Sequence, residues 1–149
     1  MKTTLISHAS LLVQSGNTTL LSDPVFFEYL WEECNVPCPS IDLDLDKLPQ
    51  IDVLNISHRH QDHFDIRTLA HIASSKTVLA PEAIVLAPRD ENLLEVLKEL
   101  EFKNVMVVED FKTIEFKDFT LTPTPSLNEQ DYFPEHGLLI HDGSVTIWN

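Results

Sequence analysis

The chain has 149 residues, a formal net charge of −14 and a mean hydropathy of −0.06. We expect one domain over residues 1–149, because that length suffices for a single core, and no apolar run approaches the ~20 residues that a membrane span needs. The acidic surface would repel phosphate backbones, which argues against nucleic acid as a partner. The N-terminus lacks the apolar core of a signal peptide, so the expected location is the cytoplasm, away from membranes.

Two apolar segments open the chain. Residues 3–13 and 18–22 are rich in Leu, Val and Thr and predict a hairpin that turns at residues 15–17. Asp23 and Pro24 would end the second strand, because proline has no N–H to donate to a sheet. Asp23 is therefore expected at a strand end, where it either initiates a turn or supports a nearby site.

Residues 25–50 predict a long irregular segment. The aromatic residues within 26–31 either cover the core or form the wall of a substrate pocket. Cys34 and Cys38 have no further zinc ligands nearby, and the loop between them is too short for an unstrained disulfide, so we expect free thiols. The acidic run 41–46 lacks the glycine and the distal glutamate of a calcium-binding loop, and it predicts a solvated edge.

Four side chains of metal-ligand type follow a buried strand predicted at residues 51–56. They are His58, His60, Asp62 and His63, in the pattern H-x-H-x-D-H. Imidazole and carboxylate groups bind zinc and other transition metals, and this spacing is hard to obtain by chance. His58 and His60 are two residues apart, so extended backbone would point both to the same side. Asp62 and His63 are adjacent and need a turn, which suits a second metal ion beside the first.

Helices and short strands follow the motif. Asp65 is a favourable N-cap for a helix that begins at Ile66. The other predicted elements are a strand at 77–81 closed by Pro81, a helix at 91–101, a strand at 105–108, a hairpin of 113–116 with 119–122, and a hairpin of 137–141 with 145–148. This order predicts an α/β (α+β) protein in which one β-sheet layer carries helices on one face.

The motif resembles that of the metallo-β-lactamase superfamily, and the N-terminus strengthens the match. Residues 6–13 and 20–24, with His8 in the first segment and Asp23 in the second, resemble the opening hairpin of the ascorbate-6-phosphate lactonase-like branch. Ser7 stands where that branch usually has glycine. The resemblance covers nearly the whole chain but only the first half of the family's αββα sandwich. We therefore expect a domain truncated at its C-terminus, without the second sheet and its helices.

The resemblance implies a two-metal site that holds zinc, with iron or manganese as alternatives. The ligands from the motif would be His58, His60, Asp62 and His63. Asp62 would also orient or deprotonate the attacking water, which makes it the predicted catalytic residue. His8 and Asp23 would support the ligands through hydrogen bonds that fix a histidine tautomer.

Family members supply further ligands that this chain does not clearly provide. The resemblance implies a third histidine about where Ser126 stands, a bridging aspartate after a strand like 145–148, and a final histidine beyond it. His136 is the nearest replacement and is predicted as a ligand, with His141 behind it. We therefore expect weaker metal binding than in a complete family member.

The function that the resemblance implies is metal-dependent hydrolysis of a small ester, lactone or phosphoester. Two alternatives stay open: iron-dependent oxidation on the same fold, and a truncated or degenerate relative without catalysis. A half sandwich would leave one sheet face bare. Either a second copy of the chain or the missing C-terminal half would then cover that face.

Overall fold

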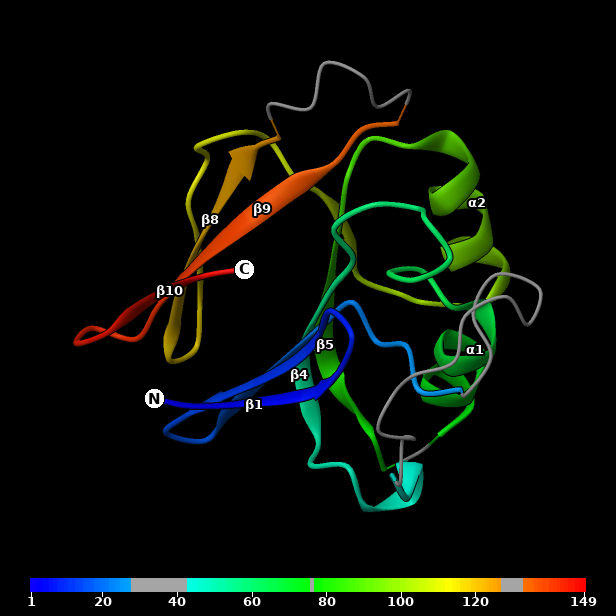
Figure 1. The fold of residues 1–149 in the computed structure, drawn as a ribbon, viewed down its shortest axis with the longest axis horizontal. Helices are drawn as coiled ribbons and strands as arrows, with labels where there is room; N and C mark the ends of the chain where they lie inside the picture. The colour runs from blue at the N-terminus through cyan, green and yellow to red at the C-terminus, as the bar shows by residue number, and fades with distance from the viewer. Residues whose placement is uncertain (28–42, 76, 127–132) are drawn as a thin grey trace.

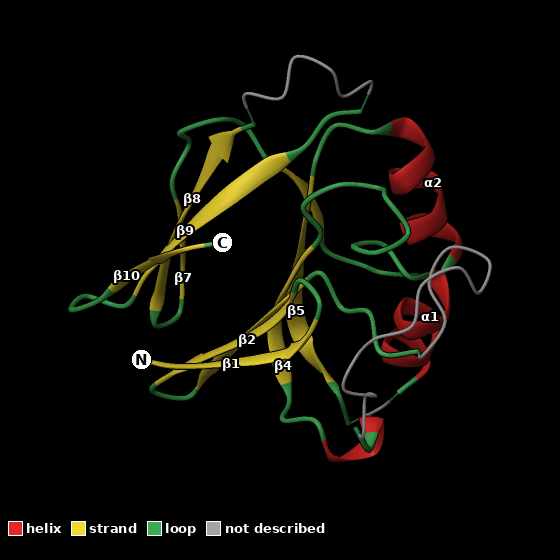
Figure 2. Ribbon diagram, in the orientation of Figure 1, coloured by secondary structure: helices red, strands yellow, loops and turns green. Residues whose placement is uncertain are grey.

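The computed structural model describes residues 1–27, 43–75, 77–126 and 133–149, which form three layers. Figures 1 and 2 show helices α1 and α2 on one side of a six-stranded sheet and a four-stranded sheet on its other side. The predicted fold class, a sheet with helices on one face, is confirmed.

The larger sheet has the strand order β1-β2-β3-β4-β5-β6. The strands span Lys2–Ser7, Ser10–Ser15, Thr18–Ser22, Ile51–Asn55, Leu79–Ala87 and Val105–Val107. Strands β1 to β3 are antiparallel neighbours, whereas β3 to β6 run parallel. The carboxyl ends of β3, β4 and β5 therefore meet at one edge of the sheet, where open parallel sheets commonly place binding sites.

The single strand predicted over residues 3–13 is wrong. The chain reverses at His8 and Ala9, so that β1 and β2 form a hairpin of their own before β2 pairs with β3. His8 adopts a φ of 41°, in the left-handed region that side chains other than glycine seldom enter. The sequence has neither glycine nor proline here, so the turn carries no local signal.

The strand predicted at residues 77–81 is too short, because β5 continues from Leu79 to Ala87. Pro81 lies where the pairing of β4 with β5 shifts register, between Ile51 and Val53. Such an irregularity tolerates a residue that has no N–H to donate. The proline therefore marks a bulge within the strand and not its end.

A second sheet is present, contrary to the expectation that it would be absent. Its strand order is β10-β9-β8-β7. The strands span Ile114–Phe116 (β7), Phe119–Pro125 (β8), His136–His141 (β9) and Thr146–Trp148 (β10). Both predicted hairpins form, and they pair with each other through β8 and β9.

The larger sheet has a hydrophobic core on each face. One core joins it to the helices and includes Leu21, Leu54, Val85, Leu69, Ile72, Leu93 and Leu97. The other joins the two sheets and includes Val13, Leu20, Val53, Leu86, Phe119, Leu121, Leu138 and Ile140. The face of the larger sheet that we expected to be bare is therefore covered by the second sheet.

Both helices begin at an aspartate. The side chain of Asp65 accepts a hydrogen bond from the backbone N–H of Thr68 and caps α1, Ile66–Ser74, as predicted. Asp90 caps α2, Glu91–Glu99, in the same way. A short 3-10 helix, Leu45–Lys47, precedes β4. None of the helices in the described ranges is long and apolar enough to cross a membrane.

Some expectations concern residues outside the described ranges. The free thiols of Cys34 and Cys38, the aromatic residues 28–31 and the start of the acidic run, residues 41 and 42, all belong to this group. These expectations stay predictions.

Candidate metal centre

The metal-ligand motif lies in the loop 56–65, which leaves the carboxyl end of β4. Two backbone hydrogen bonds hold the start of this loop against the neighbouring strands. Ile56 N–H donates to Leu86 O at 2.9 Å, and Asp23 N–H donates to Asn55 O at 2.9 Å. The loop therefore starts from a fixed point between β3 and β5, and a rigid scaffold of this kind can aim its side chains.

The three histidines of the motif converge, as the sequence predicts. The ring centroid of His58 lies 4.7 Å from that of His60 and 4.1 Å from that of His63. Their convergence is confirmed, whereas their role as ligands stays a prediction.

Asp23 is the main support of the loop. Its carboxylate is 2% exposed and accepts hydrogen bonds from Ser57 N–H at 2.7 Å, Ser57 Oγ at 2.7 Å and His63 Nδ1 at 2.9 Å. Because a carboxylate can only accept, the proton of His63 is on Nδ1, and the Nε2 atom is left with its lone pair. The predicted contact between Asp23 and the motif is confirmed.

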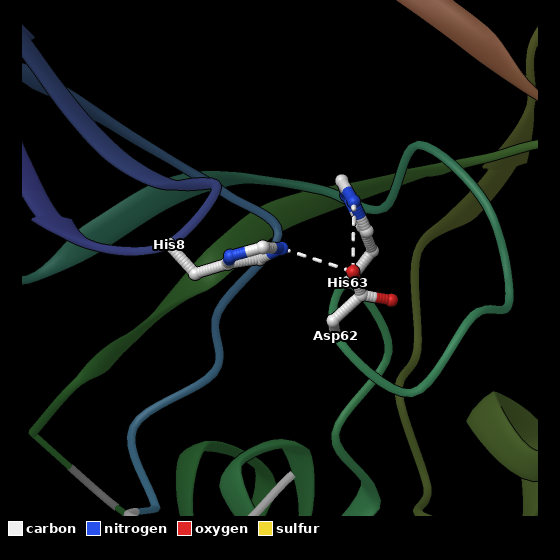
Figure 3. Close-up of side chains that lie close together, drawn as sticks. All are labelled: His8, Asp62 and His63. Atoms are coloured by element: carbon white, nitrogen blue, oxygen red, sulfur yellow. Dashed lines mark hydrogen bonds and ion pairs between the residues drawn. The ribbon is translucent and has the colours of Figure 1, made fainter. Parts of the chain in front are cut away.

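Asp62 faces two histidines from different parts of the chain. Its Oδ2 lies 2.9 Å from His8 Nε2 and 3.8 Å from His63 Nε2. Figure 3 shows the three side chains pointing toward one another, with His8 entering from the β1–β2 turn. Within the described residues, one ligand atom from each lies within 4.8 Å of the others, and this group includes neither His58 nor His60.

The carboxylates around His63 favour a positive charge at this position. Burial lowers the pKa of His63, but the hydrogen bond and negative charge of Asp23, with the charge of Asp62, raise it above its ordinary value overall. Burial likewise raises the pKa of Asp62, but its own backbone N–H, His63 and His8 lower it below the ordinary value overall. Two carboxylates thus surround one imidazole.

His58 behaves differently, since burial and the neighbouring His63 lower its pKa to about 4. Ser57 Oγ lies 2.9 Å from His58 Nδ1. The imidazole of His58 is therefore neutral near pH 7, which is the form that binds a metal.

His136 lies at the start of β9, beside the loop. Its backbone N–H donates to Ser57 O at 3.2 Å, and its Nε2 lies 2.9 Å from Asn55 Oδ1. The amide group of Asn55 donates to Ser22 Oγ, so Oδ1 is the atom that faces His136 and accepts its proton. The Nδ1 atom of His136 then carries a buried lone pair for which the described residues provide no partner. Burial lowers the pKa of this imidazole to about 4.

The family model of the β-lactamase superfamily domain matches residues 2–143. The chain belongs to this family. It is 30% identical over 125 residues, 83% of its length, to the 4-amino-L-phenylalanyl-CmlP-peptidyl-carrier-protein 3-hydroxylase of Streptomyces venezuelae. The crystal structure of CmlA, a diiron β-hydroxylase from Streptomyces venezuelae, is 26% identical with a TM-score of 0.72 and covers 97% of this chain. The metallo-β-lactamase fold that the sequence predicts is thereby confirmed.

The fold also matches that of an isothiocyanate hydrolase from Delia radicum gut bacteria, with 19% identity and a TM-score of 0.72. That match covers 99% of this chain and 61% of the hydrolase. The chain spans only 28% of the diiron hydroxylase structure and 18% to 50% of the curated relatives that it matches. Proteins that share this fold are therefore named both as hydrolases and as hydroxylases.

Sequence reasoning missed three residues that build the site: Asn55, Ser57 and Arg59. Asn55 and Ser57 adjoin the motif, but Asn and Ser are common where strands end, so their types alone do not mark them. Arg59 pairs with the α2 cap Asp90 at 3.2 Å and lies 3.6 Å from the ring centre of Phe133. Their partners are remote in the sequence, so their roles had no local signal.

A cavity of about 470 Å³ adjoins the loop. Its walls come from the ends of β5 and β8, the segment after β6 and the residues around the start of β9. His136 and Phe133 line it, and Phe133 also contacts the ring of His60. The cavity therefore shares a wall with the metal-ligand motif.

Proposed function

We propose that the chain carries the metal-binding loop of a metal-dependent hydrolase that acts on a small molecule. The proposed ligands are His58, His60, Asp62, His63 and His136. The observation that carries the proposal is a pair of buried ligand atoms, Asp62 Oδ1 and His136 Nδ1, that have no hydrogen-bond partner among the described residues. They accompany the converging histidines His58, His60 and His63.

The donor set fits a metal ion. A buried polar atom without a partner costs about 1–3 kcal/mol, so these atoms favour a ligand that accepts their lone pairs. Asp23 and Asn55 fix the protons of His63 and His136 so that one lone pair on each ring stays free. Nitrogen and carboxylate oxygen donors suit zinc, iron and manganese alike.

A metal bound here would lower the pKa of a water ligand and polarise the substrate's carbonyl or phosphoryl oxygen. Asp62 would accept the proton of the attacking water through Oδ1, a buried atom that has no hydrogen-bond partner among the described residues. Asp23 holds His63 through Nδ1 and anchors the loop through Ser57. Both actions keep the ligands in place during the reaction.

We propose an ester, a lactone or a phosphoester as the substrate class. The cavity beside His136 has the volume of a small-molecule site. Arg89 lines it and is exposed, so it could bind an anionic group of such a substrate. The formal charge of −14 disfavours nucleic acid. The resemblance of residues 6–13 and 20–24 to the lactonase-like branch makes lactones the first substrates to test.

The test combines metal loading with a substrate panel. Protein stripped with a chelator and reloaded with zinc is assayed against chromogenic esters, lactones and phosphodiesters, beside His60→Ala and His141→Ala variants. We expect turnover by the wild type and by His141→Ala, whose imidazole bonds to Val145 O and Thr146 at the other end of β9. His60→Ala should be inactive. Activity that survives both the chelator and His60→Ala would refute the proposal.

A second candidate function is iron-dependent oxidation. The relatives that share 26% and 30% identity with this chain are named as a diiron β-hydroxylase and a 3-hydroxylase, whereas the hydrolase compared above shares only 19%. The same nitrogen and carboxylate donors bind iron. Reloading with iron(II) and following oxygen uptake with a reductant present separates the two functions. Oxygen uptake that needs His60, without zinc-dependent hydrolysis, would favour oxidation.

A further inference from the structure

We propose that His8 is a direct ligand of the metal ion that Asp62 and His63 hold, and not only a hydrogen-bond partner of Asp62. The inference rests on the metal-binding function proposed above. It identifies the turn between β1 and β2 as the source of a third protein ligand, which the loop 56–65 alone cannot supply for this ion.

The distances between the three side chains fit one shared ion. Two ligands that each lie about 2.0–2.2 Å from a metal are about 2.9–3.5 Å apart when they subtend an octahedral or tetrahedral angle. Asp62 Oδ2 lies 2.9 Å from His8 Nε2 and 3.8 Å from His63 Nε2. All three ligand atoms lie within 4.8 Å of one another, so small side-chain rotations bring them onto one ion.

The hydrogen bonds direct the right atoms inward. Asp23 accepts the proton of His63 Nδ1, which leaves the Nε2 lone pair facing Asp62. His8 also presents Nε2 to Asp62, and no other hydrogen-bond partner of its ring is seen among the described residues. Moving the ring proton of His8 to Nδ1 frees the Nε2 lone pair for a metal. Asp62 and His8 would then each bind the same ion instead of bonding to each other.

The backbone conformation of His8 at this turn is strained. His8 has a φ of 41°, a conformation that glycine or asparagine adopts more readily. The hydroxyl of the preceding Ser7 is buried and has no partner in residues 1–27, 43–75, 77–126 and 133–149. Strained residues of this kind concentrate at functional sites, where the surrounding structure enforces them. Here the strain directs the imidazole of His8 across the end of the sheet toward Asp62, as Figure 3 shows.

The side chain of His8 also has room to adjust, because it is 47% exposed. The other two members of the group are more enclosed, at 22% for His63 and 23% for Asp62. A ligand set with two enclosed members and one exposed member can admit an ion from solvent and close on it by a rotation of the exposed ring. His8 is the member that would rotate.

Cadmium-113 nuclear magnetic resonance tests this directly. The wild-type protein is labelled with ¹⁵N-histidine, stripped with a chelator and loaded with cadmium-113. A direct bond gives a scalar coupling between cadmium and the bonded nitrogen, whereas a hydrogen-bonding histidine gives none. We expect coupling at Nε2 of both His8 and His63. Because this readout uses the wild-type chain, it does not depend on any variant folding.

Two variants sharpen the result. His8→Asn suits the positive φ of the turn and should lose one coupled nitrogen while His63 keeps its own. Zinc affinity at that ion should fall at least about tenfold. The control His141→Ala should change neither the cadmium coupling of His8 and His63 nor the zinc affinity. Coupling at His63 without coupling at His8 would overturn the role of His8 and leave the metal site intact. Absence of cadmium coupling at every histidine would overturn the proposed function as well.

Discussion

The two ends of the sandwich use similar side chains to different effect. At the metal-loop end, which comprises Asp23, residues 55–65 and His136, one buried atom each of Asp62 and His136 lacks a hydrogen-bond partner within the described part of the chain. At the opposite end, which comprises Asp52, Lys117, Asp118 and Asp142, each carboxylate accepts hydrogen bonds from its neighbours. Asp52, 5% exposed, accepts from Thr19 N–H at 2.9 Å and from Lys117 Nζ at 2.6 Å.

The opposite end joins the two sheets. Asp118 Oδ2 accepts from Thr18 Oγ1 at 2.7 Å and from Asn17 N–H at 3.1 Å, and Asp142 accepts from Ser15 Oγ at 2.9 Å. A carboxylate with its partners complete stabilises the fold, whereas one that keeps a buried free oxygen is available to a ligand. We therefore expect the opposite end to stabilise the fold and the metal-loop end to bind a ligand.

The largest expected effect tests the support given by Asp23. Asp23→Asn is isosteric and suits its φ of 44°, but it turns one acceptor into a donor. If the amide N–H faces His63 Nδ1, the proton of His63 moves to Nε2 and blocks the metal. Zinc affinity should fall about 10- to 100-fold, with little change in folding. Calorimetric titration measures this.

Asp118→Asn is the matched control for this prediction, because Asp118 also anchors a loop across the two sheets. It should leave zinc affinity unchanged. Equal losses of affinity in the two variants would show that Asp23 acts through general stability and not through the tautomer of His63.

The sequence predicts the parts of the site that depend on local contacts and misses those that depend on remote ones. The motif, the cap Asp65 and the helix α2 depend on neighbours within a few residues, so the sequence indicates them. The bond of His136 to Asn55 joins residues 81 positions apart. Contacts of that range depend on how the sheets pair, which periodicity does not encode.

The second sheet shows the same limit. Its two hairpins are evident from turn residues, but nothing local decides whether they extend the first sheet or pair with each other. The core between the sheets decides it, because Phe119, Leu121, Leu138 and Ile140 all present their apolar side chains to one face. The sequence does not predict the turn at His8, because its residues are not those that favour a positive φ.

Acid should destabilise the two ends over different pH ranges. Burial lowers the pKa of His136 from 6.5 to about 4. The unfolded chain takes up this proton near pH 6.5, whereas the folded chain takes it up only near pH 4. The free energy of unfolding of chelator-treated protein should therefore fall between those values, by about 1.4 kcal/mol per pH unit for this one proton.

The opposite end should respond only at lower pH. Backbone and hydroxyl donors hold the pKa values of Asp118 and Asp142 below the ordinary 3.8, so their contribution is complete above that value and is lost below it. Urea unfolding of the wild type and of His136→Gln at several pH values tests the assignment. Identical slopes for the two proteins between pH 6.5 and pH 4 would rule out a buried neutral His136.

A smaller loss is expected from Lys117→Met. This change removes the cation that pairs with the buried Asp52 and leaves its carboxylate with Thr19 N–H alone. Stability should fall by about 1–3 kcal/mol without any change in zinc affinity. Lys112→Met is the control, because the pair of Lys112 with Glu109 is exposed and should contribute at most about 1 kcal/mol. Thermal unfolding compares the two.

The smallest effect is a gain in stability. Glu101 follows the C-cap of α2 with a φ of 62°, and the bonds Glu101 N–H to Lys98 O and Phe102 N–H to Leu97 O form a Schellman motif. Glu101→Gly should stabilise the chain by about 0.5–1 kcal/mol, because glycine adopts this φ without strain. An unchanged or lower melting temperature would show that the glutamate carries a contact that offsets the strain.

The central claim is that the loop 56–65 builds a metal centre, and the metal content of purified protein tests it most directly. Elemental analysis is performed on wild type, His60→Ala and His141→Ala prepared without chelator. We predict bound zinc, iron or manganese in the wild type and in His141→Ala, at about one or two ions per chain, and a marked loss in His60→Ala. Metal at the level of the buffer in all three proteins would contradict the account.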